Sequence, residues 1–196
     1  MKRSLLLLIL VALAAPVWAQ RGGLTIPRNL DQLTDRAAVI VRGSVISARV
    51  EKHPELSGLN TVLVKLRVKE TLKGQAKGTF TFRQYIWDIR DRNDAAGYRK
   101  GQDLLLLMIA PSRYGLSSPA GLEQGRFRIL RDSTGKAFAV NGHGNARLFD
   151  GIGTQMAKEG VILSPRSTTL LEKHRKGPVA LAELTGLIRE LAKGSE

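Results

Sequence analysis

Apolar and polar side chains alternate most clearly between residues 62 and 69, and this alternation predicts a half-buried β-strand. The apolar positions are Val62, Val64, Leu66 and Val68, and the cationic positions between them are Lys65, Arg67 and Lys69. Successive side chains of a strand point to opposite faces, so one face meets a core and the other meets water. The sequence therefore predicts a strand with an apolar inner face and a basic outer face.

Similar patterns predict further strands. In the strand predicted at 39–51, the alternation of apolar and polar side chains is interrupted once. Its apolar face switches at Gly43, and an inserted residue has this effect in a bulge, so we expect a bulge or sharp bend there. Leu104 to Ile109 is apolar on both faces, which is typical of a central strand covered on both sides. The other expected strands are 79–82, with Phe80 and Phe82 inward, and a hairpin pair at 126–131 and 136–140.

Two helices are expected, one at each end of this run of strands. Asn29 is a suitable N-cap for a short helix over Leu30 to Arg36. Near the C-terminus, Pro178 occupies a favourable first helical position, and apolar residues then recur on one face up to 193. That stripe consists of Leu181, Leu184, Leu187, Ile188 and Leu191. We expect this amphipathic helix, 178–193, to dock on the protein's own core.

The order of these elements predicts a mainly β fold with flanking α-helices. Strands that follow one another without intervening helices favour an antiparallel, strongly curved sheet. The economical arrangement is a small OB-type barrel with a short N-terminal helix and a C-terminal amphipathic helix. We expect an irregular lead-in at 20–28 and a single barrel domain at 29–196. Residues 88–99 are polar and predict a loop, and the pattern between 149 and 165 favours no particular element.

The first nineteen residues have the composition of a secretory signal peptide. Lys2 and Arg3 precede an uncharged apolar run, and Val17 and Ala19 are the small residues expected before a cleavage site. We predict cleavage after Ala19 and a periplasmic or secreted protein that begins at Gln20. No later apolar run reaches the about 20 residues of a membrane-spanning helix, so we expect no transmembrane anchor after cleavage.

Charge and cysteine content narrow the classes of partner and chemistry. The chain has 31 Lys and Arg against 17 Asp and Glu, a formal net charge of +14, and no cysteine. A strongly basic protein adsorbs to anionic polymers such as nucleic acid, lipid headgroups, cell-wall phosphates and acidic glycans. Export argues against nucleic acid and favours an anionic cell-envelope polymer or an envelope protein as the partner. Without cysteine, thiol catalysis, cysteine-ligated zinc and iron–sulfur clusters are excluded.

The basic outer face of the strand at 62–69 is the candidate binding surface. Its predicted ligand-binding residues are Lys65, Arg67, Lys69, Arg83, Tyr85 and Trp87. Residues 83, 85 and 87 share one side of their strand if the alternation continues, and basic and aromatic side chains on a barrel face bind oligonucleotides or oligosaccharides. The alternative interpretation of this row is a solvated outer face without a ligand.

No linear motif predicts catalysis, a metal site or a cofactor. Ser133 and Lys136 have the S-x-x-K spacing of penicillin-interacting enzymes, but they lie in a predicted turn and the partner motifs are missing. His53, His143 and His174 are far apart in the sequence and lack metal-ligand spacing. The acidic loop around Asp91 is interleaved with arginines, which favours ion pairs over calcium. We therefore expect a non-enzymatic binding domain; the alternative is an envelope enzyme whose site is assembled from separate loops.

Three stretches of the chain carry a resemblance to a known class of domain. They are LTDRAAVIVRGSVISARVE, VLVKLRVKETLKG and GYRKGQDLLLLM. Over about Leu30 to Ile109 the chain resembles exported bacterial proteins of uncharacterised function, whose domain is similar to the netrin-like module of the tissue inhibitors of metalloproteinases. The resemblance implies an OB-type barrel. Those inhibitors chelate zinc through an N-terminal cysteine, whereas position 20 here is Gln, so the resemblance implies no inhibitory residue.

Overall fold

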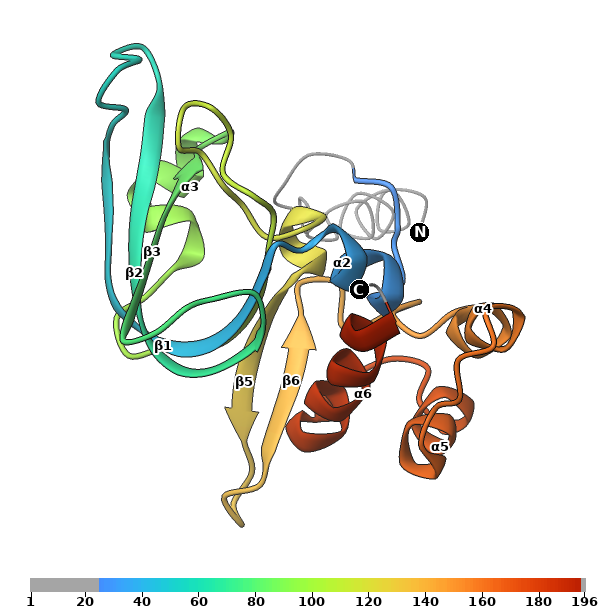
Figure 1. Ribbon diagram of the computed structural model, residues 1–196. Helices are drawn as coiled ribbons and strands as arrows, with labels where there is room; N and C mark the ends of the chain where they lie inside the picture. The colour runs from blue at the N-terminus through green and yellow to red at the C-terminus, as the bar shows by residue number, and fades with distance from the viewer. Residues whose placement is uncertain (1–24, 195–196) are drawn as a thin grey trace, which may run out of the picture.

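A single antiparallel sheet of seven strands organises the chain in the computed structural model, which describes residues 25–194 (Figure 1). The strands occur in the order β3-β2-β1-β4-β5-β6-β7. Their bounds are β1 Val39–Lys52, β2 Asn60–Lys73, β3 Thr79–Tyr85, β4 Asp103–Met108, β5 Arg126–Arg131, β6 Ala137–Asn141 and β7 Val179–Ala180. The predicted mainly β, antiparallel fold is confirmed.

The first four strands curl into a small barrel that the segment after β4 closes. This segment pairs antiparallel with β4 through Met108 and Pro119, and parallel with β3 through Arg83 and Leu116. The Ser117 amide also donates to the Arg83 carbonyl at 2.8 Å. Strands β5 to β7 continue the sheet outside this ring, so the closed barrel takes only part of the sheet.

Two apolar clusters fill the molecule, and β4 contributes to both. Leu104 and Leu106 point into the barrel with residues of β1, β2 and β3. Leu105 and Leu107 point to the opposite side, where β5 to β7 pack against helices. All four side chains are fully buried. The prediction that this strand is covered on both faces is therefore confirmed.

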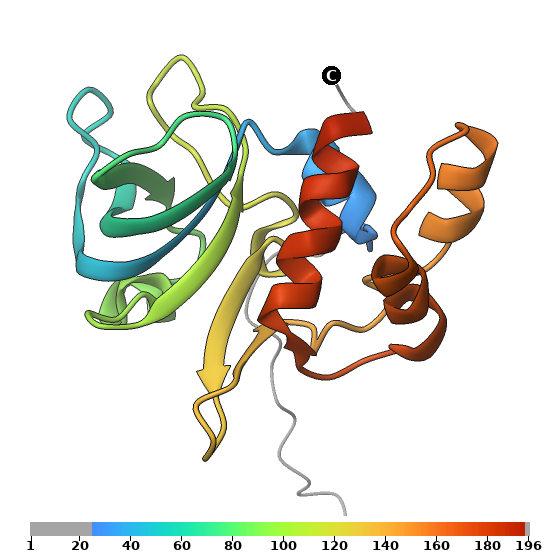
Figure 2. The ribbon, with the colours of Figure 1, turned by 60° about the horizontal axis from the view of Figure 1, so that its bottom comes forward.

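The two terminal helices pack together in the second cluster. Helix α2 (Leu30–Arg36) begins at Asn29, whose side chain accepts from the Gln32 amide in a capping box, as the N-cap prediction required. Helix α6 (Leu181–Gly194) runs beside it (Figure 2). The predicted start at Pro178 is wrong by three residues, because Val179 and Ala180 pair with β6 and form β7 before the helix begins.

Short helices occupy two regions where the sequence pattern predicted none. Residues 88–99, predicted as a loop, contain the one-turn helix α3 (Ile89–Asn93) and the 3-10 helix η1 (Ala95–Gly97). The side chains of Asp88 and Asp94 cap the N-termini of these two helices. This capping stabilises short helices in a segment whose polar composition is typical of a loop. Helices α4 (Ile152–Lys158) and α5 (Pro165–Lys173) form beyond β6 and lie on one side of α6, with α5 in contact with it (Figure 2). A further 3-10 turn, η2 (Leu122–Gln124), precedes β5.

Within residues 25–194, no helix is both long enough and apolar enough to cross a membrane.

The end of β2 ties the barrel to both terminal helices. Glu70 pairs with Arg42 of β1, Nε to Oε2 at 2.9 Å, and with Arg189 of α6. Lys73 Nζ donates to the Thr34 carbonyl at 2.9 Å, near the C-terminus of α2, where a cation also interacts favourably with the helix dipole. The stretch from Glu70 to Lys73 therefore fixes the position of the helices relative to the barrel.

Gly43 lies at a break in the β1–β2 register, which confirms the predicted bulge. An added Cβ would lie 2.5 Å from the Arg67 carbonyl oxygen, whereas a Cβ on Gly186 of α6 would meet nothing within 4 Å. We expect Gly43→Ala to lower the free energy of unfolding by about 2–4 kcal/mol through strain. Gly186→Ala should raise it by about 0.5–1 kcal/mol through helix propensity. Urea denaturation of both variants tests this contrast; equal effects would contradict it.

Candidate functional site

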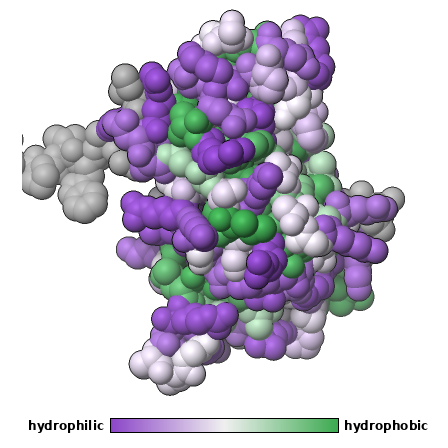
Figure 3. Space-filling model, turned by 90° about the vertical axis from the view of Figure 1, so that its left-hand side faces the viewer, coloured by the Kyte–Doolittle hydropathy of each residue, from purple (hydrophilic) through white to green (hydrophobic). Residues whose placement is uncertain are grey.

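The outer face of the barrel carries two rows in which a cation lies between hydroxyl side chains. The register aligns Ser47, Lys65 and Thr81 across β1, β2 and β3, and likewise Ser44, Arg67 and Thr79. Lys65 and Arg67 are exposed, and within residues 25–194 no hydrogen bond or ion pair engages either charged group. Hydrophilic side chains cover much of this side of the molecule (Figure 3). These two rows, which we call the cationic rows, keep two of the six predicted ligand-binding residues together.

Lys69 continues the alternation of β2, but its charge is already neutralised. Its Nζ lies 2.7 Å from Asp103 Oδ1, and the Ser44 hydroxyl donates to the same carboxylate. Burial alone would raise the pKa of Asp103, but the Lys69 and Ser44 hydrogen bonds outweigh it and lower that pKa. Asp103 therefore stays ionised at neutral pH, and Lys69 is less available to an external anion than Lys65.

Arg83, another of the six predicted ligand-binding residues, is engaged by neighbouring side chains in the structure. Its guanidinium donates to Thr61 Oγ1 at 2.9 Å and pairs with Glu51 at 2.7 Å. Only 15% of its side chain is exposed. The segment that closes the barrel bonds to the Arg83 backbone, so this residue links β1, β2 and the closing segment. Its role in the described structure is to hold the barrel together.

Tyr85 and Trp87 lie beyond the cationic rows, at the end of β3. Strand β3 ends at Tyr85, which pairs across the sheet with Thr61. The Tyr85 and Trp87 rings make a T-shaped contact with centroids 4.9 Å apart. Trp87 is nevertheless 71% exposed, and it borders a groove of about 1030 Å³. The register keeps Tyr85 on the face of the sheet that carries Lys65 and Arg67, whereas Trp87, two residues further along the chain, lines the groove.

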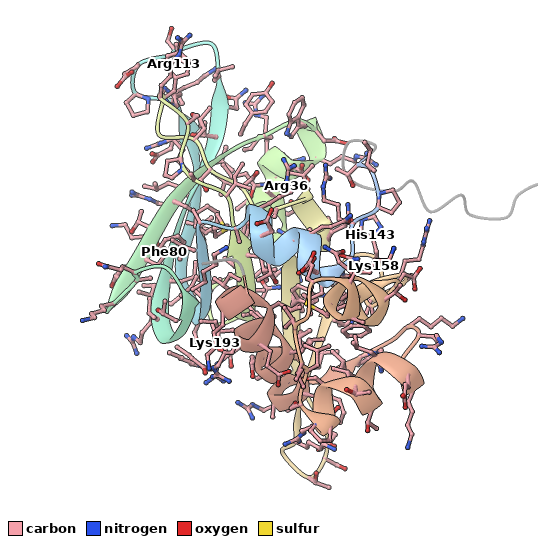
Figure 4. The ribbon with its side chains drawn as sticks, turned by 45° about the vertical axis from the view of Figure 1, so that its right-hand side comes forward. Arg36, Phe80, Arg113, His143, Lys158 and Lys193 are labelled. Carbon is pink, nitrogen blue, oxygen red and sulfur yellow. The ribbon has the colours of Figure 1, made fainter. Side chains whose placement is uncertain are left out.

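The groove lies between the barrel and the second half of the molecule. One wall comes from the end of β3, α3 and η1, and the other comes from η2, the start of β5 and the turn after β6. Thr25 to Arg28 of the lead-in line part of it. His143 marks the turn after β6, on the opposite side of the molecule from Phe80 (Figure 4). Segments far apart in sequence therefore build this site.

A fixed set of polar side chains forms one part of the groove lining. Arg126 stacks over the Tyr98 ring at 4.6 Å, donates to the Ala96 carbonyl at 2.6 Å, and pairs with Glu123 at 2.6 Å. Burial raises the pKa of Tyr98 to about 12. Its hydroxyl therefore stays protonated and donates to Gln84 Oε1 at 2.8 Å. These groups are held in place before any ligand arrives.

Buried amide side chains hold the other wall. Gln124 accepts from the Arg28 amide at 2.7 Å and donates to Thr25 Oγ1 at 2.8 Å, which attaches the lead-in to η2. Asn141 donates to the Gln124 carbonyl at 3.0 Å and accepts from the Asn145 amide at 2.8 Å. No local sequence pattern reveals this network, because Thr25, Arg28 and Asn141 lie far from Gln124 along the chain.

The three histidines have different surroundings in the structure. His53 is buried beside the tip of the β1–β2 hairpin, where Nε2 lies 2.8 Å from the Tyr114 carbonyl. His174 Nε2 lies 3.1 Å from the Gly177 carbonyl, whereas His143 is exposed in the groove. Among residues 25–194 no group of three or more His, Cys, Asp or Glu side chains is arranged to hold a metal ion.

The acidic residues around α3 have structural roles. Asp88 caps α3 and pairs with Arg90, and Asp94 caps η1. Asp132 likewise organises the turn that contains Ser133 and Lys136, because its Oδ1 accepts from the Thr134 and Lys136 amides.

Comparison of the chain with models of protein families, with curated proteins and with solved structures finds no match to any of them.

Proposed function

We propose that the protein is an exported, non-enzymatic binding domain that holds an anionic polymer of the cell envelope on its cationic rows. The observation that carries this proposal is the pair Lys65 and Arg67, both exposed and both without an acidic partner in the described chain. Alternate residues of a strand are about 6.6 Å apart. A polyanion lying along β2 could therefore place successive charged groups on the two cations and receive hydrogen bonds from the hydroxyls of Ser47, Thr79 and Thr81.

The overall charge supports the same proposal. If the chain is cleaved after Ala19, Lys2 and Arg3 are removed and the remaining 29 basic residues exceed the 17 acidic ones by 12. Such an excess attracts polyanions over distances of about the Debye length, 8–10 Å at physiological ionic strength. The attraction should be weak at each contact, sensitive to salt, and selective for charge density more than for chemical detail.

An envelope enzyme with a loop-assembled site is the second candidate, and one observation favours it. His143 and Glu123 line the same groove although they come from different loops. Glu123 Oε1, however, pairs with Arg126 at 2.6 Å, and the His143 ring has no hydrogen-bond partner within residues 25–194. General acid–base catalysis requires a positioned donor or acceptor. The arrangement therefore supports binding better than catalysis.

The proposal predicts a specific loss when the charges of the cationic rows are reversed. Lys65→Glu combined with Arg67→Glu should weaken binding to immobilised heparin and to polygalacturonate by roughly tenfold or more at low salt, since each cation near an anionic surface contributes about 1 kcal/mol. Binding should also fall steeply with salt for the unsubstituted protein. Surface plasmon resonance across a series of salt concentrations measures both effects.

A matched control is available on the helices of the other half. Lys158 of α4 and Lys173 of α5 are exposed, and Figure 4 shows Lys158 far from Phe80 of the barrel. Lys158→Glu with Lys173→Glu changes the net charge by the same amount. If both double variants lose affinity equally, only net charge matters and the cationic rows are not the site. Binding that does not change with salt would refute the proposal altogether.

A further inference from the structure

We propose that the groove beside Trp87 is a second binding site, and that it takes the pyranose ring of a glycan. The site is separate from the cationic rows, so this inference stands without the proposed function. It is based on an exposed indole, on planar polar side chains fixed around it, and on the size of the groove. Each of these features matches a property of sugar rings.

Trp87 provides an apolar surface that the protein core does not use. A tryptophan that is 71% exposed is informative, because large aromatic side chains are usually well buried. Its T-shaped contact with Tyr85 steadies the ring while most of the indole stays in solvent. A pyranose ring has faces made of C–H groups, and such a face can cover an indole, whereas a purely polar or highly charged ligand could not.

Planar polar groups lie around this aromatic surface. Asp88 and Arg90 form a forked pair, with Arg90 Nε 3.0 Å and 2.9 Å from the two carboxylate oxygens. Gln84 and Glu123 line the same groove, and Tyr98 and Arg126 hold them in place. The equatorial hydroxyls of a sugar form paired hydrogen bonds with carboxylates, amides and guanidinium groups of this kind. Because these side chains are fixed in advance, binding would cost little side-chain entropy.

The size and charge of the groove limit the kinds of glycan that it could bind. Its volume of about 1030 Å³ lies at the upper end of the range of small-molecule pockets and exceeds the volume of a single sugar ring several times. Two of its acidic side chains are paired with arginines, Asp88 with Arg90 and Glu123 with Arg126. The groove therefore presents mixed hydrogen-bonding groups, which suits a short stretch of uncharged or weakly acidic glycan.

Saturation-transfer NMR with the full chain tests the site, using tetramers of N-acetylglucosamine, glucose and galacturonate as probes. We expect transfer to the ring protons of at least one tetramer. Trp87→Ala should weaken that binding roughly tenfold, in line with the cost of losing an aromatic stacking partner, and Trp87→Phe should retain most of it. Because Trp87 is exposed, both variants should show the same melting curve as the parent.

Two controls separate this site from the proposed function. Tyr114→Ala removes an exposed aromatic residue elsewhere on the surface, 37% exposed, and should leave sugar binding unchanged. The Lys65→Glu, Arg67→Glu variant should also bind the sugar normally, and binding of the uncharged tetramers should not depend on salt. Absence of transfer to all three tetramers, or transfer that survives Trp87→Ala, would overturn the inference while leaving the proposal of polyanion binding to its own test.

Discussion

A chain that ends at Gly177 should fail to fold into a soluble, cooperative unit. Its missing segment carries β7 and α6, and Leu184, Leu187 and Ile188 of α6 are fully buried in the second apolar cluster. Removing five or six such side chains from the core costs on the order of 8–15 kcal/mol gross, which equals or exceeds the whole stability of a typical domain. Size-exclusion chromatography and thermal unfolding followed by circular dichroism measure the effect.

A chain that ends at Gly194 is the matched control, because it keeps all of α6 and should melt like the full chain. Leu187→Ala provides a graded version of the truncation, with an expected loss of about 2–5 kcal/mol. Lys193→Ala, at an exposed position of the same helix, should stay within about 0.5 kcal/mol. A soluble monomer ending at Gly177 with an unchanged melting curve would show that α6 is dispensable to the core.

Asn145→Asp should lower the free energy of unfolding by about 3–5 kcal/mol at neutral pH, although it exchanges only one amide nitrogen for oxygen. Asn145 is fully buried, and its Nδ2 donates to the Ala139 carbonyl at 2.9 Å and the Gly177 carbonyl at 2.8 Å. Aspartate leaves both carbonyls facing a charged oxygen, and each buried polar group without a partner costs about 1–3 kcal/mol. Urea denaturation gives the difference directly.

Substitution by aspartate separates the effect of the lost hydrogen bonds from any effect of backbone strain. Asn145 has a φ of 57°, a left-handed conformation that aspartate tolerates about as well as asparagine, so backbone strain should not contribute. Asn93→Asp makes the same chemical change at an exposed position of α3 and should have little effect on stability. A comparable loss in both variants would mean that the buried network contributes no more than an ordinary surface amide.

Local patterns in the sequence predicted the elements whose causes are local. The alternation around Leu66 gave β2 its inner and outer faces, and Asn29 marked the start of α2 because its capping partner Gln32 is three residues away. Leu184 and Leu187 predicted the buried face of α6 through their helical spacing. In each of these cases the residues that determine the element lie within a few positions of one another.

Contacts between distant parts of the chain explain what the sequence interpretation missed. Strand alternation predicts Arg83 as a ligand-binding residue, but no local pattern reveals its ion pair with Glu51, which lies on another strand. The groove likewise joins Gln84, Arg126 and His143, which lie on three different segments. The alternation of β3 predicted Trp87 as a candidate, but the groove that it lines depends on residues from the other half of the chain.

The position of β4 has a consequence for how this chain can be divided. Leu104 and Leu106 belong to one apolar cluster and Leu105 and Leu107 to the other, so the boundary between the clusters runs through a strand and not through a linker. Neither half could be excised or exchanged without removing β4 leucines that the apolar cluster of the other half needs. We therefore expect the barrel and the helical half to unfold in one cooperative transition.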